Sequence, residues 1–127
     1  HLLQSEPFLK VQLTKPFTAT VQTQLVGDYN LPNILAAVAT GVYFKVPEQK
    51  IINAIESYTP SNNRSQLIHA GSNEIIMDAY NANPSSMKAA IENFAKLHAN
   101  QKIMLLGAMA ELGQESLWEH EQLIKTI

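Results

Sequence analysis

Hydrophobic and polar residues alternate in two short stretches near the start of the chain. Phe8–Leu13 and Phe17–Leu25 both follow a period of two, and Lys15 and Pro16 lie between them. Alternation of this kind is typical of strands that bury one face and leave the other wet, and proline favours a turn. The pattern therefore predicts an antiparallel pair of strands.

The spacing of apolar residues changes to that of helices between residues 30 and 60. They recur every three or four positions in two stretches, first Leu31, Ile34, Leu35, Val38 and Val42, then Ile51, Ile52, Ile55 and Tyr58. Each set predicts a helix with one apolar stripe. Asn30 is a candidate cap for the first helix, and Pro60 is expected to follow the end of the second.

A polar segment at residues 59–63 is the best linker candidate because it carries a proline just past a helix. Beyond it the pattern predicts strand, strand, helix, strand and helix, at Gln66–Ala70, Glu74–Asp78, Pro84–His98, Lys102–Leu106 and from Ser116 onward. Strands and helices that alternate with short connections favour parallel strands in an α/β layer. We therefore expect two parts, residues 1–62 and residues 63–127.

Composition narrows the class of protein. The 127 residues are 46% hydrophobic and 16% charged, with a formal net charge of −2 and no cysteine. This balance disfavours nucleic acid and membrane insertion, excludes a disulfide scaffold, and fits a cytoplasmic globular protein. The four histidines lack metal-ligand spacing. The chain starts without methionine and stops within a helical pattern, so we expect an internal piece of a longer protein.

Two asparagines stand at the predicted start of the first helix. Asn30 and Asn33 are three positions apart, so their side chains are neighbours on a helix. A side-chain amide offers donors and an acceptor, which suits the edge of a purine ring. The alternative is purely structural, with Asn30 as a helix cap and Asn33 as a surface residue.

A second candidate segment follows the predicted strand that ends at Asp78. The loop after it is rich in amides and hydroxyls and leads into a helix. Parallel α/β proteins bind ligands beyond the carboxyl ends of their strands, and a helix start favours anions. Turn chemistry alone would explain Asn83 as a cap before Pro84, but it would not explain Tyr80 and Asn81 in the same loop.

A third candidate segment, Leu105–Gly113, holds two glycines that permit close approach of the backbone. By itself this pattern is weak. No GxxxxGK[ST] phosphate loop and no Ser/His/Asp arrangement can be found, so no catalytic residue is assigned.

Taken in order, these segments resemble the Mur ligase superfamily, from about Gly27 to the end of the chain. The superfamily's His-Asn-x-x-Asn segment is matched by Asn30 and Asn33, with Tyr29 in place of the histidine. Its arginine at the start of the C-terminal domain is matched by Arg64, and its strand-end aspartate by Asp78. The resemblance implies that Asn30, Asn33, Arg64 and Asp78 bind ATP.

The loop after Asp78 is similar to that of the superfamily members that add D-alanyl-D-alanine. The matching residues are Tyr80, Asn81, Asn83 and Ser86, and the resemblance implies that they bind this dipeptide. The Leu-Gly-x-Met-x-Glu-Leu-Gly segment is also similar, with His120 at the expected distance downstream. Its usual aspartate is replaced by Ala108.

This resemblance implies an ATP-dependent ligase that joins D-alanyl-D-alanine to UDP-N-acetylmuramoyl-tripeptide in peptidoglycan synthesis. It implies the end of a central ATPase domain at residues 1–62 and the first part of a Rossmann-like C-terminal domain at 63–127. The Mg²⁺ ligands and phosphate loop would lie outside this chain, which would be inactive alone and part of a monomer. Two alternatives remain: a ligase for another amino acid, and a non-catalytic α/β module that binds nucleotides or peptides.

Overall fold

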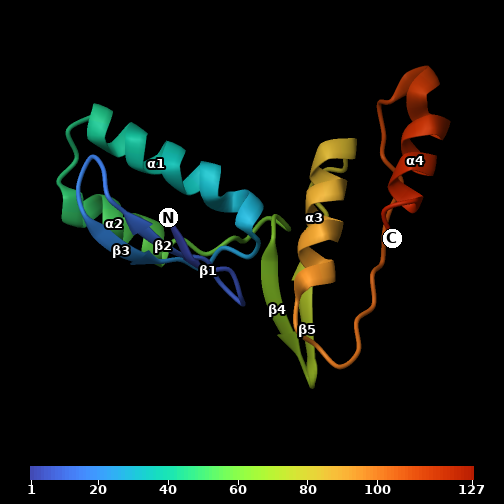
Figure 1. Ribbon diagram of the computed structural model, residues 1–127, viewed down its shortest axis with the longest axis horizontal. Helices are drawn as coiled ribbons and strands as arrows, with labels where there is room; N and C mark the ends of the chain where they lie inside the picture. The colour runs from blue at the N-terminus through green and yellow to red at the C-terminus, as the bar shows by residue number, and fades with distance from the viewer. The chain divides into compact units, whose positions relative to one another are not determined.

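The computed structural model describes all 127 residues, and it contains both helices and strands (Figure 1). The chain divides into two compact units, His1–Asp78 and Ala79–Ile127. The boundary between domains that we predict after residue 62 stays a prediction. The first compact unit extends further, to Asp78, and Ser65 is hydrogen-bonded to Tyr29 within it.

The first unit begins with a three-stranded antiparallel sheet. Its strands, in the spatial order β1-β2-β3, are β1 (Leu2–Gln4), β2 (Lys10–Leu13) and β3 (Ala19–Gln22). Val11 pairs with Val21 on the buried face, whereas Gln12 pairs with Thr20 on the polar face. The predicted antiparallel pair with one wet face is therefore confirmed.

Two helices cover the buried face of this sheet. They are α1 (Leu31–Tyr43), preceded by the short 3₁₀ turn η1 (Asp28–Asn30), and α2 (Glu48–Ser57). Ile34 and Val38 of α1 join Ile51 and Ile55 of α2 in one core with the inward residues of β2 and β3. Both predicted helices are confirmed, but both buried stripes are narrower than predicted, since Leu35 and Val42 of α1 are exposed and Tyr58 is exposed beyond the end of α2.

A separate β-hairpin ends the first unit. Its antiparallel strands are β4 (Gln66–Ala70) and β5 (Asn73–Met77), and the turn between them holds Gly71 at a positive φ of 61°. Both predicted strands are confirmed, but β5 lies one residue earlier than predicted, so Asp78 follows the strand instead of ending it. They pair only with each other, so the two sheets remain distinct.

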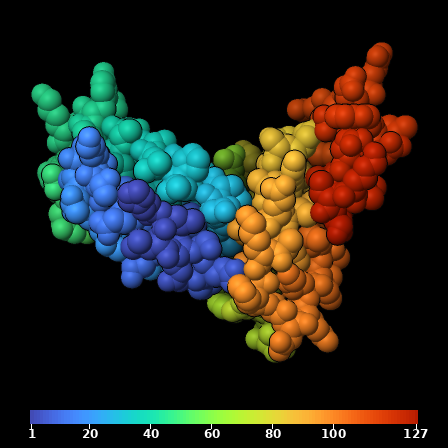
Figure 2. Space-filling model, viewed as in Figure 1, coloured from blue at the N-terminus to red at the C-terminus, as the bar shows by residue number.

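The second unit consists of helices and long connections. They are α3 (Pro84–Lys96), the 3₁₀ turn η2 (Gly113–Glu115) and α4 (Ser116–Ile124). Its small core is formed by Ile91 of α3, Leu123 of α4 and Met109 of the connection between them. Figure 2 shows the two helices in contact. The longest helices of the chain, α1 and α3, have 13 residues each, and no helix is long and apolar enough to span a membrane.

The predicted strand Lys102–Leu106 does not form, and the predicted parallel pairing is also absent, since every strand pair is antiparallel. Ile103 and Leu105 are 81% and 93% exposed, so this apolar run has no neighbouring strand to pair with. A strand needs such a partner for its backbone hydrogen bonds. The ammonium of Lys102 instead binds the carbonyls at the end of α3, at 2.7 Å from Ala95 O.

Candidate functional site

The two asparagines at the start of α1 form one hydrogen-bonded pair. Asn33 Nδ2 donates to Asn30 Oδ1 at 2.9 Å, and Asn30 Nδ2 donates to the Val26 carbonyl at 2.8 Å. Asn30 is only 8% exposed, whereas Asn33 faces solvent. Asn30 occupies the cap position of α1, but its side chain makes no capping bond, so the predicted capping role is wrong.

The two asparagines have different roles in this arrangement. The amide of Asn30 is used within the protein, since it donates to Val26 and accepts from Asn33. Asn33 keeps its own carbonyl oxygen and one N–H for a ligand. An acceptor beside a donor matches the edge of adenine, which presents an amino group next to a ring nitrogen.

A second polar cluster joins the start of α1 to the chain just before β4. The Tyr29 and Ser65 hydroxyls lie 2.8 Å apart, and Ser65 N donates to Asp78 Oδ1 at 3.1 Å. Asn30 Nδ2 is also 3.5 Å from Ser65 Oγ. Four residues from three parts of the first unit, including two of the predicted ATP-binding residues, are therefore linked through one serine.

The Tyr29 ring has a position set by its neighbour Gly27. Gly27 has a φ of 87°, and a Cβ there would lie 2.3 Å from Tyr29 Cε1. Burial raises the pKa of the Tyr29 phenol; the hydrogen bond to Ser65 lowers it, and the charge of Asp78 raises it further. The hydroxyl therefore stays protonated at neutral pH and can donate or accept a hydrogen bond.

Arg64, the remaining predicted ATP-binding residue, is exposed and lies in a tight turn. Its neighbours Asn63 and Ser65 both have positive φ, at 57° and 49°. A non-glycine residue in this region costs about 1–2 kcal/mol. The surrounding contacts must hold this turn in place, and those of Ser65 are the ones described above.

In the second unit, Asn83 and Ser86 bind each other at the start of α3. Asn83 Oδ1 accepts from Ser86 N at 2.9 Å, and Ser86 Oγ accepts from Asn83 N at 3.2 Å. This is a capping box, which confirms the structural interpretation of Asn83. The polar groups of Asn83 and Ser86 already cap the start of α3, so binding of the dipeptide would be a second role for them.

Tyr80 and Asn81 lie before this cap and are open to solvent. Tyr80 is 60% exposed, and Asn81 Oδ1 accepts the N–H of Ala82 at 2.9 Å. That local bond orients the Asn81 side chain and leaves its two amide N–H groups directed elsewhere. These donors could meet a peptide carbonyl or carboxylate.

His120 is a further residue that organises a candidate segment. Its Nε2 accepts the Met109 backbone N–H at 3.0 Å, and its Nδ1 lies 2.6 Å from the Ser116 carbonyl. These two contacts of the ring tie the 107–113 loop to α4. From the residue pattern alone, His120 is predicted to be a helix-surface or packing residue, because no local spacing reveals a partner eleven residues away.

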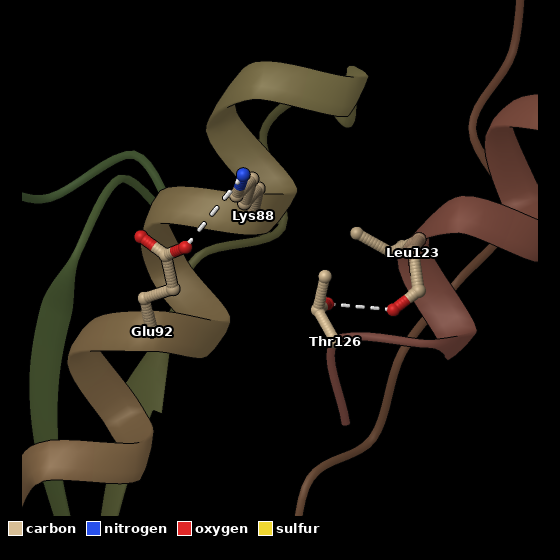
Figure 3. A network of polar contacts seen from close by, with 4 residues as sticks. All are labelled: Lys88, Glu92, Leu123 and Thr126. Carbon is tan, nitrogen blue, oxygen red and sulfur yellow. Dashed lines mark hydrogen bonds and ion pairs between the residues drawn. The ribbon is translucent and has the colours of Figure 1, made fainter.

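Two hollows in the chain do not coincide with the predicted residues. One, of about 340 Å³, lies in the first unit beside Pro60 and Leu67. The other, of about 400 Å³, lies between α3 and α4, and Lys88, Leu123 and Thr126 are among its lining residues. Figure 3 shows Lys88 paired with Glu92 on α3, and Thr126 bonded to Leu123 at the end of α4. None of the eight predicted binding residues lines either hollow. No group of three or more His, Asp or Glu could hold a metal ion.

Comparison with known proteins identifies the class. The family described as "Mur ligase, glutamate ligase domain" matches residues 63–127. The chain belongs to the Mur ligase family, as its motifs predict.

Curated relatives include two bacterial proteins named UDP-N-acetylmuramoyl-tripeptide–D-alanyl-D-alanine ligase. The Bacillus subtilis protein is 38% identical over 91 residues, which are 70% of this chain and 20% of the relative. The Buchnera aphidicola protein is 32% identical over 121 residues, or 94% of this chain and 25% of the relative. The chain thus spans about a fifth to a quarter of the length of these relatives.

Solved structures agree with the fold. MurF from Acinetobacter baumannii matches with a TM-score of 0.86 and 30% identity, over 97% of this chain and 27% of that one. A MurF ligase from Thermotoga maritima, solved in complex with ADP, has a TM-score of 0.83 over 99% of this chain and 29% of that one. Its 23% identity shows the fold alone. The predicted α/β fold class is confirmed.

Proposed function

We propose that this chain is part of an ATP-dependent ligase that joins D-alanyl-D-alanine to UDP-N-acetylmuramoyl-tripeptide in the cytoplasm. The observation that carries the proposal is the shared name of its curated relatives, which align over 70% to 94% of the chain. In such a ligation, ATP transfers its terminal phosphoryl group to a carboxylate and leaves as ADP. The amine of the dipeptide then attacks the acyl phosphate, which forms the amide bond and releases phosphate. Positioning and charge stabilisation dominate chemistry of this kind.

Within this ligase, residues 1–62 would end the ATP-binding domain and residues 63–127 would begin the C-terminal domain. The family match that starts at residue 63 supports this division. Asn33 would contact adenine, and Asn30 would orient the Asn33 side chain. Arg64 and Asp78 would face the ribose and phosphates. Mg²⁺ would be held by residues outside this chain, and the complete protein would act as a monomer.

The ATP-binding role predicts a selective loss in Asn33→Ala. The substitution removes an exposed amide and leaves the buried bond from Asn30 to Val26 in place. We expect ATP affinity to fall by about 1–2 kcal/mol, the scale of hydrogen bonds to a ligand. Titration calorimetry on the full-length ligase measures this, and the KM for the dipeptide is the internal control. Unchanged ATP binding would leave Asn33 a surface residue.

The dipeptide-binding role predicts the opposite selectivity in Asn81→Ala. Its only bond within the chain is to the next residue, so the fold should tolerate its loss. We expect the KM for D-alanyl-D-alanine to rise roughly tenfold, equivalent to about 1.4 kcal/mol, with little change in the KM for ATP.

Asn83→Ala provides the matched comparison, because it removes the cap of α3 and should cost about 1 kcal/mol of stability. A thermal melt of each variant therefore separates binding from folding. Wild-type dipeptide kinetics in a stable Asn81→Ala variant would make the loop structural. They would favour a ligase for another substrate or a non-catalytic module.

A further inference from the structure

Ser65 is the residue at which the polar groups of the first unit converge. It is 5% exposed, its hydroxyl lies 2.8 Å from that of Tyr29, and its N–H binds Asp78 at 3.1 Å. One side chain thus links the segment before α1 to the segment before β4, 36 residues apart. No other long-range pair of hydroxyl groups of this kind occurs among the hydrogen bonds described above.

The backbone at Ser65 cannot hold its conformation by itself. Asn63 and Ser65 both adopt positive φ, a conformation that is unfavourable for residues other than glycine in the free chain. Such conformations persist only where surrounding contacts determine them, and they gather at ligand-binding positions. Tyr29 and Asp78 supply these contacts, and Arg64 lies between the two strained residues.

Tyr29 is itself held from the opposite side. Its ring lies against the backbone of Gly27, where no side chain could fit, and it is half-buried in the 3₁₀ turn η1. The raised pKa of its phenol keeps the hydroxyl protonated. The hydroxyl is therefore a fixed group beside Ser65, not the end of a mobile side chain.

We propose that Tyr29 is a positioning residue for the nucleotide. Through its bond to Ser65 it fixes the turn that carries Arg64 and keeps Ser65 in contact with Asp78. The predicted ATP-binding residues on this turn and at Asp78 are thereby held in place relative to Asn30 and Asn33. This inference rests on the proposed ATP site. Tyr29 need not touch the nucleotide. If Tyr29 lacked its hydroxyl, the strained turn would become ordered only when the nucleotide binds, and the cost of that ordering would reduce the affinity for the nucleotide.

Tyr29→Phe tests this directly, because it removes the hydroxyl and keeps the ring. In the full-length ligase, the Kd for ATP, measured by titration calorimetry, should rise about three- to tenfold, the effect of one hydrogen bond. The KM for D-alanyl-D-alanine should not change. Ser65→Ala should raise the Kd for ATP at least as much, since it also removes the longer contact from Asn30, and the double variant should be no worse than Ser65→Ala alone, because both substitutions break the same Tyr29–Ser65 bond. Tyr43→Phe is the matched control, since Tyr43 is 79% exposed at the end of α1, and its ATP affinity should match wild type.

Each outcome decides between the inference and the function on which it rests. A lower melting temperature with unchanged ATP affinity in Tyr29→Phe would make the bond purely structural and overturn the inference. Additive effects in the double variant would do the same. If Asn33→Ala weakens ATP binding and Tyr29→Phe does not, the inference fails while the ATP site stands. If neither variant changes ATP binding, both fail.

Discussion

Replacing Gly27 with alanine should lower the free energy of unfolding by about 2–6 kcal/mol. Two separate costs contribute. At φ 87° and ψ 133°, the backbone of Gly27 is in a region that other residues rarely occupy, which costs roughly 1–3 kcal/mol. The added Cβ would also lie 2.3 Å from the Tyr29 ring, and overpacking of that kind costs roughly 1–3 kcal/mol unless the ring moves.

Two other glycines separate these costs. Gly71 has a φ of 61° with nothing within 4 Å of a built Cβ, so Gly71→Ala should show only the conformational cost of about 1–2 kcal/mol. Gly107 has the same open surroundings without a positive φ, so its alanine variant should stay within about 0.5 kcal/mol of wild type. Chemical denaturation measures all three. Equal losses in Gly27→Ala and Gly71→Ala would mean that the ring contact contributes nothing.

The parts of the fold that follow from local periodicity are predictable from the sequence. Helix α1 begins at Leu31, the first residue of its predicted apolar stripe, and α2 contains the predicted apolar residues Ile51, Ile52 and Ile55. The β4–β5 hairpin turns at Gly71, as the break in its pattern predicts. In each case the apolar spacing, the turn residue and the core agree, and agreement between levels makes an element predictable.

The segment Lys102–Leu106 shows the limit of this reasoning. Its apolar residues predict a strand, but a strand exists only where a neighbour completes its hydrogen bonds. In this structure Leu105 is 93% exposed and Lys102 binds the end of α3. The strand pattern is therefore necessary but insufficient, because pairing depends on residues that the local sequence does not specify.

The sequence predicts which residues belong to the candidate site, but not which hydrogen bonds connect them. The residues around Asn30 and Asn83 are visible as amide-rich helix starts, and Asn83 caps its helix as local rules require. Asn30 does not, because its Oδ1 accepts from Asn33 and its Nδ2 donates to the buried Val26 carbonyl. Side chains of this type have several local partners, and burial decides among them.

Ser65 could not have been found from the sequence. It lies in a polar linker beside Arg64, where a serine is ordinary, and its partner Tyr29 is 36 residues away. Only the folded chain brings them within 2.8 Å. The departure from the family pattern at Tyr29 thus places a hydroxyl at the distance where Ser65 can meet it.

Replacing Asn30 with alanine should affect folding and ATP binding together. The buried Val26 carbonyl loses its donor and Asn33 loses its acceptor, so the free energy of unfolding should fall by about 1–3 kcal/mol. In the full-length ligase, the Kd for ATP should rise at least as much as in Asn33→Ala, because the contact residue is no longer oriented. Denaturation and titration calorimetry measure the two effects.

Asn53→Ala is the control for removing an asparagine amide from a helix. Asn53 is exposed on α2 and bonds only to Gln49 on the same helix, so its loss should stay within about 0.5 kcal/mol. Combining Asn30→Ala with Asn33→Ala should weaken ATP binding no more than Asn30→Ala alone, because the first substitution already disorders the second residue. Full additivity of the two variants would show that each asparagine contacts the nucleotide independently, and the assignment of Asn30 as the orienting residue would then be wrong.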